Sequence, residues 1–138
     1  MGKIDENLKS KMAEKVEEGT LTADDISEYM ELLVQICNEN EEVQEEVEGW
    51  NRVFQCSIEG SEDLWLKVED GTFSTSKGKI EEPDITFEFD ADTAIGIFSG
   101  EVDATQAYMN NELKVVGPLP DAVKFKTLTE LVREEIED

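Results

Sequence analysis

The pattern that decides the fold stands at residues 85–89, which read ITFEF. Ile85, Phe87 and Phe89 alternate with the polar Thr86 and Glu88, so the three apolar side chains fall on one face of an extended chain. This alternation predicts a β-strand with one buried face, and it is the clearest strand pattern in the chain. A half-buried strand needs partner strands and a covering layer, and the flanking sequence supplies both.

Three further strands are predicted upstream of this stretch. Residues 54–58 and 64–68 alternate in the same way, and Asp70-Gly71 between residues 64–68 and 72–76 is a strong two-residue hairpin signal. A polar loop at residues 77–83 then leads into the strand at 85–89. We therefore predict an antiparallel meander with one apolar face.

Helical patterns flank the strands on both sides. Ile4, Leu8, Met12 and Val16 recur every four residues, and Gly19 is placed to end that helix. Capping signals then predict helices that begin at Thr22, at Asn40, at Asp90 or Asp92, and at Asp103. Residues 113–116 form a fifth strand that ends at Gly117, and Pro118 and Pro120 suit the start of a final apolar-faced helix. The expected fold class is α+β, with a five-stranded, mainly antiparallel sheet covered by helices and one added N-terminal helix.

Composition favours a folded, strongly acidic domain. The 138 residues carry 12 Lys and Arg against 35 Asp and Glu, a formal net charge of −23. Leu, Ile, Val and Phe make up 36 residues, about 26% of the chain, which exceeds the roughly 20% below which chains tend to stay disordered. The field of such a protein repels nucleic acids and anionic lipid headgroups, so we expect no nucleic-acid partner and no docking on anionic membranes.

Residues suited to catalysis or metal binding are scarce in this sequence. It has no His, and its two Cys residues, Cys37 and Cys56, lack metal-ligand spacing and stand in apolar-patterned stretches. We interpret them as reduced, buried thiols of a cytoplasmic protein without a secretion signal or membrane span. The paired acids fall on polar helix faces and are interpreted as solvated surface. We expect no catalytic residue, no metal and no cofactor.

Six aromatic residues lie on the apolar faces of elements that must pack together. They are Phe54, Phe87, Phe89, Phe98, Tyr108 and Phe125. Periodicity leaves two interpretations open, because the same pattern describes a filled core and the wall of a ligand cavity.

Two ordered stretches carry a family resemblance. Residues 83–87 (PDITF) are followed by residues 99–108 (SGEVDATQAY), and residues 113–117 (LKVVG) run into Leu119, Ala122, Val123 and Phe125. In this order and with these gaps, the pattern resembles the sterol carrier protein 2 (SCP-2) family, whose sterol-binding domain it matches over roughly residues 41–132. The resemblance implies that residues 23–138 form a sterol-carrier-like lipid-binding domain and that residues 1–22 are a helical extension.

The resemblance also implies an apolar cavity under the sheet and a non-enzymatic function in binding or transferring a lipid. Its ligand would be a fatty acid, an isoprenoid or a sterol-like molecule. The candidate ligand-binding residues on this chain are Phe87, Phe89, Ile95, Phe98, Tyr108, Leu113, Val115, Phe125, Leu128 and Val132.

One departure from the family pattern concerns the recognition of an anionic headgroup. Asn111-Glu112 stands where the family usually has Gly-Lys, so a cation that could meet an anionic headgroup is absent at this position.

Two other functions remain open at the level of sequence. One is an accessory module with a self-filled core that docks on a partner protein or forms a homodimer. The other is an enzyme that uses acids such as Glu88 or Glu112 beside the pocket. The N-terminal helix could cover the cavity or mediate pairing.

Overall fold

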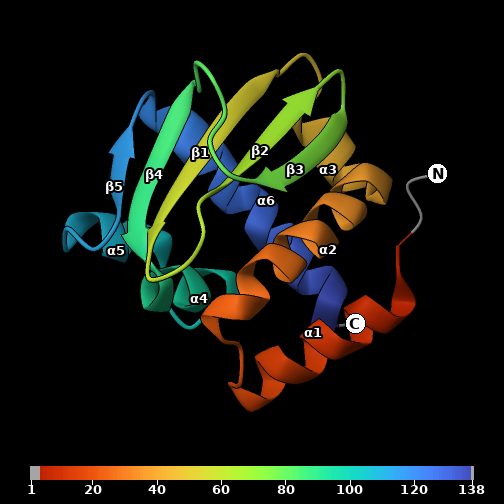
Figure 1. The fold of residues 1–138 in the computed structure, drawn as a ribbon. Helices are drawn as coiled ribbons and strands as arrows, with labels where there is room; N and C mark the ends of the chain where they lie inside the picture. The colour runs from red at the N-terminus through yellow and green to blue at the C-terminus, as the bar shows by residue number, and fades with distance from the viewer. Residues whose placement is uncertain (1–3, 138) are drawn as a thin grey trace.

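The computed structural model describes residues 4–137 as one five-stranded sheet with six α-helices packed around it. The chain runs through α1 (Glu6–Glu18), α2 (Ile26–Glu39), α3 (Glu41–Glu46), β1 (Arg52–Glu59), β2 (Leu64–Glu69), β3 (Thr72–Lys77), β4 (Ile85–Asp90), α4 (Ala91–Ser99), α5 (Ala104–Met109), β5 (Lys114–Val116) and α6 (Leu119–Glu137). A short 3₁₀ turn, Ala23–Asp25, precedes α2. Figure 1 shows α2 and the long α6 lying along the sheet, with α1 outside them.

The sheet has the strand order β3-β2-β1-β4-β5. The pairs β3–β2, β2–β1 and β4–β5 are antiparallel, whereas β1 and β4 are parallel, with Cys56 opposite Phe87. The α+β class and the mainly antiparallel five-stranded sheet are therefore confirmed. The meander is shorter than expected, because it ends at β3 and β4 lies on the other side of β1.

A buried amide helps to hold the segment that makes this crossing. Gln55 on β1 is 5% exposed, and its Nε2 donates to the carbonyls of Leu64 and Gly78 at 3.1 Å. Its Oε1 accepts from the backbone N–H of Ile80 at 2.9 Å. The Asp84 carboxylate then accepts from the N–H of Val53 at 2.8 Å, which sets the register of β4 against β1. The polar loop predicted at 77–83 thus acts as a crossover connection.

Local signals in the sequence place most element ends. Asp5, Asn40, Asp90 and Asp103 cap α1, α3, α4 and α5 through their side chains, and Thr22 and Asp25 form the expected capping box. Asp70 and Gly71 adopt φ values of 51° and 81° in the β2–β3 turn, as the hairpin signal requires. The predicted caps at Thr22, Asn40, Asp90 and Asp103 and the predicted hairpin turn are confirmed, and the cap at Asp5 was not predicted.

Helix α1, which lies within the residues predicted to form an extension, packs directly on the rest of the fold. Met12 of α1 is fully buried, and α1 lies against α2 and α6. No helix within residues 4–137 is long and apolar enough to cross a membrane.

Candidate functional site

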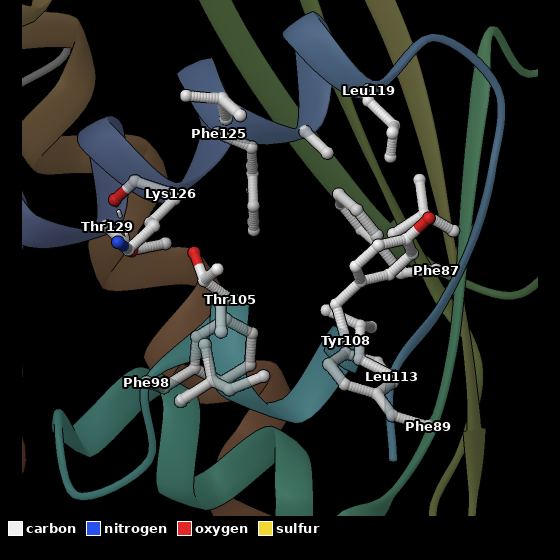
Figure 2. Close-up of a pocket in the computed structure, with 15 residues that line it drawn as sticks. Phe87, Phe89, Phe98, Thr105, Tyr108, Leu113, Leu119, Phe125, Lys126 and Thr129 are labelled. Atoms are coloured by element: carbon white, nitrogen blue, oxygen red, sulfur yellow. Dashed lines mark hydrogen bonds between the residues drawn. The ribbon is translucent and has the colours of Figure 1, made fainter. Parts of the chain in front are cut away.

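An apolar pocket of about 210 Å³ lies between the β4–β5 edge of the sheet and the helices α4, α5 and α6. Figure 2 shows its side chains converging from β4, α5 and α6 on a common space. The pocket is lined by Phe87, Phe89, Ile97, Phe98, Ala104, Thr105, Tyr108, Leu113, Val115, Leu119, Ala122, Val123, Phe125, Lys126 and Thr129. Eleven of these fifteen side chains are purely hydrocarbon, so the pocket is suited to an apolar ligand.

An aromatic cluster forms the inner wall of the pocket. The ring of Phe87 on β4 lies 5.2 Å from that of Phe125 on α6, and both rings pack on Phe54 of β1, at 5.8 and 5.3 Å between centroids. Phe54 is fully buried and does not line the pocket. Rings in contact at these separations support one another, so this wall is held from the sheet side and from the helix side.

The mouth of the pocket is open to solvent. Tyr108, Leu119 and Val123 line the pocket and are 41%, 47% and 63% exposed. The pocket is therefore open to solvent on the side that these three residues form.

A buried carboxylate fixes the start of α6, which supplies one side of the mouth. Asp121 in the first turn accepts hydrogen bonds from Trp50 Nε1 at 2.9 Å and Arg52 Nε at 2.7 Å. Burial acts to raise the pKa of the Asp121 carboxyl, but these hydrogen bonds and the charge of Arg52 outweigh it, so its pKa lies below the usual range. The negative charge also suits the N-terminus of a helix.

The α4 side of the pocket is fixed by α2. The Tyr29 hydroxyl donates to the backbone carbonyl of Phe98 at 3.0 Å, and the two rings stack with centroids 5.4 Å apart. At Gly96 on the same helix, a Cβ atom would come within 2.4 Å of a methyl group of Val102. This close approach holds the segment before α5 against α4.

Polar groups gather at one end of the pocket. Figure 2 shows Thr105, Lys126 and Thr129 together on one side, across the space from Phe87, Leu113 and Leu119. Thr129 is 3% exposed, and its hydroxyl donates to the backbone carbonyl of Lys126 at 2.7 Å. Three of the four polar side chains that line the pocket therefore lie at this end, whereas the hydroxyl of Tyr108 lies on the opposite side, near Phe87 and Leu119.

The SCP-2 sterol transfer family model matches residues 33–130, which is more than half of the chain. The chain belongs to the SCP-2 sterol transfer family. A search of curated proteins found no match.

Solved structures of SCP-2 domains share the fold. The solution structure of sterol carrier protein domain 2 of Helicoverpa armigera is 19% identical, with a TM-score of 0.60, over 77% of this chain and 86% of that one. A ubiquinone synthesis protein, UbiJ-SCP2, is 17% identical, with a TM-score of 0.60, over 74% of this chain and 90% of that one.

A larger enzyme contains a similar part. The stereoselective inverting sec-alkylsulfatase Pisa1 from Pseudomonas sp. is 19% identical, with a TM-score of 0.64, over 79% of this chain. This SCP-2 family chain spans only 16% of the sulfatase's length.

The structure brings together seven of the ten residues predicted as ligand-binding. Those that line the pocket are Phe87, Phe89, Phe98, Tyr108, Leu113, Val115 and Phe125. Their contact with a ligand remains a prediction.

Three predicted residues do not line the pocket. Leu128 and Val132 are fully buried in the core, and Ile95 on α4 is half-buried outside the pocket lining. On α6, Leu128 lies about half a turn away from the pocket-lining Val123 and Lys126, whereas Val132 lies on nearly the same face as the pocket-lining Phe125 but about two turns farther along the helix. An apolar residue on a ligand-bearing helix can thus belong to the other face.

Eight lining residues were missed by the sequence analysis. They are Ile97, Ala104, Thr105, Leu119, Ala122, Val123, Lys126 and Thr129. The spacing of Leu119, Ala122, Val123 and Lys126 is that of one helix face, and this signal could have identified these four residues.

The acids considered for catalysis lie elsewhere. Glu88 and Glu112 are exposed and border a different surface depression together with Asp63 and Asp90, so neither lines the apolar pocket. Within residues 4–137, no group of three metal-ligating side chains is placed to hold a metal ion. What the pocket itself offers is binding of an apolar molecule.

Proposed function

We propose that this SCP-2 family protein is a non-enzymatic carrier that binds an apolar small molecule or lipid chain in the pocket between β4, β5, α4, α5 and α6. The observation that carries the proposal is the pocket's lining, in which hydrocarbon side chains surround a space of about 210 Å³. Membership of a sterol transfer family supports the same assignment.

The size of the pocket limits how much ligand it holds. A water-sized group takes up about 30 Å³, so the space accommodates roughly seven methylene-sized groups. At about 0.8 kcal/mol per buried CH₂, these contribute about 5.6 kcal/mol, which corresponds to a Kd on the order of 0.1 mM. A longer isoprenoid or acyl chain would therefore extend past the mouth, over Tyr108, Leu119 and Val123.

Transfer of the ligand fits the open mouth, because a chain can enter and leave without unfolding the wall. The net charge of −23 directs such exchange toward uncharged surfaces and away from anionic membranes. We place the protein in the cytoplasm, where its two buried, free thiols would stay reduced.

A series of linear alcohols tests the proposal. Affinity from butanol upward, measured by calorimetry or NMR titration, should rise about fourfold with each added carbon, since each buries one more CH₂. The rise should level off near heptanol or octanol, where the pocket is full. An affinity that does not depend on chain length, or no saturable binding at all, would overturn the proposal and favour the self-filled accessory module.

A further inference from the structure

The polar end of the apolar pocket opens beside a second space, which we call the polar hollow. It measures about 220 Å³ and is lined by Ile97, Gly100, Glu101, Val102, Asp103, Ala104, Lys126, Thr129, Glu130 and Arg133. Ile97, Ala104, Lys126 and Thr129 line both spaces. A molecule whose chain fills the apolar pocket would therefore place its headgroup at this junction.

Lys126 is the only charged residue that lines the apolar pocket within residues 4–137, and it already has two carboxylate partners. Its Nζ lies 3.7 Å from Asp103 Oδ1 and 3.9 Å from Glu130 Oε2. Asp103 is fixed in place because its carboxylate also caps α5, accepting from the Thr105 N–H at 2.8 Å. The cation nearest to a headgroup is thus shared between two acids that the chain itself supplies.

The remaining charges do not create an anion site. Glu101 adds a third carboxylate to the polar hollow, and Arg133 is the only other base there. The Arg133 guanidinium donates to the backbone carbonyl of Ile97 at 3.2 Å. Three acids against two bases leave the hollow net negative, within a protein that carries −23 overall. A ligand carboxylate placed here would meet repulsion from Asp103 and Glu130.

An uncharged headgroup avoids this repulsion. The hydroxyl oxygens of Thr105 and Thr129 stand at the same end of the pocket, and both can accept a hydrogen bond.

Building on the proposed function, we infer that Asp103 and Glu130 are specificity-determining residues. By pairing with Lys126 they make the pocket select chains with an uncharged, hydroxyl-type headgroup and reject chains that end in a carboxylate.

Octanol and octanoate, measured on the full chain at pH 8, test this inference, because the two chains have equal length and differ in headgroup charge. Octanol is expected to bind at least tenfold more tightly than octanoate. In the double variant Asp103→Asn, Glu130→Gln, the freed Lys126 should attract the carboxylate, so the ratio of octanol affinity to octanoate affinity should fall about fivefold. Asn at position 103 keeps the helix cap, so α5 is preserved.

Two controls isolate the role of these acids. The double variant Glu17→Gln, Glu18→Gln on α1 removes the same amount of charge from exposed positions outside both spaces and should leave the octanol-to-octanoate ratio unaltered. Adding Lys126→Met to the Asp103→Asn, Glu130→Gln variant should abolish the fall in that ratio.

The outcomes separate the inference from the proposed function. Octanol binding with an unchanged affinity ratio in the Asp103→Asn, Glu130→Gln variant would overturn the inference and leave the carrier function standing. Equal affinities of octanol and octanoate in the unmodified protein would do the same. If neither ligand binds, the carrier function falls, and the inference with it.

Discussion

Replacement of Ala122 by Leu distinguishes an open pocket from a filled core. Ala122 lines the pocket on the inner side of α6, and its neighbours there are Val123, Phe125 and Lys126. Leucine adds about three methylene-sized groups, which would occupy roughly 90 of the 210 Å³. The new side chain would thus take the place of ligand carbon atoms.

The substitution should have opposite effects on binding and on stability. Displacing about three ligand CH₂ groups costs about 2.4 kcal/mol, which lowers octanol affinity by up to ~60-fold. Because the added methyl groups fill available space, the free energy of unfolding should rise by about 1 kcal/mol. In a filled core the same substitution would overpack and destabilise the protein by about 1–3 kcal/mol.

Urea unfolding monitored by circular dichroism and octanol titration by NMR give the two readings. The matched control is Ala13→Leu on α1, a partly buried helical position outside the pocket, which should leave octanol affinity unchanged. The reasoning is refuted if Ala122→Leu destabilises the protein by more than 1 kcal/mol and binds octanol as the original chain does.

Three further substitutions or measurements test the surrounding structure. Asp121→Asn should lower the free energy of unfolding by about 1–2 kcal/mol at pH 7. Because the pKa of Asp121 is lowered in the folded protein, the carboxylate's contribution to stability is present above its ordinary pKa of about 3.9 and disappears as the pH falls through the lowered value. A difference between the two urea midpoints that does not shrink as the pH falls below about 3.9 would contradict this. Gly117→Ala should lower the free energy of unfolding by about 2 kcal/mol or more, because φ is +133° and a Cβ atom would lie 2.6 Å from the Asp84 carbonyl oxygen. An unchanged urea midpoint would contradict this and show that the backbone at the β4–β5 junction shifts to make room for the Cβ atom. Burial raises the pKa of the Cys37 thiol, and that of Cys56 to about 12, so thiol reagents at pH 8 should label both only on unfolding; rapid labelling of the native protein would disprove the burial of these residues.

The sequence predicts local structure well in this chain, because local structure depends on neighbouring residues. The alternation at Ile85, Phe87 and Phe89 and the caps at Asp90 and Asp103 each place an element correctly. The pairing of β4 with β1 was not predicted, because it does not depend on neighbouring residues alone. It depends on Gln55 and Asp84 holding a crossover segment, and a buried glutamine in a strand looks like any outward-facing polar residue.

The candidate site was predicted in part for a similar reason. Strand residues such as Phe87 and Val115 were found because a strand has only two faces, and one of them is apolar. On α6 the apolar residues spread around the helix, and periodicity alone does not say which face meets the pocket and which meets α1 and α2. The pairing of Lys126 with Asp103 joins residues from two elements, so no local pattern reveals it.

The most direct test of the central claim is where a bound apolar chain sits. Intermolecular NOEs between octanol and the protein in solution report this position. The account predicts contacts from the octanol methyl and methylene protons to Phe87, Leu113 and Phe125, and from the carbinol protons to Thr105 and Thr129. Contacts confined to exposed side chains such as Met109 and Val116, or shifts that do not saturate, would contradict a ligand-binding pocket in this protein.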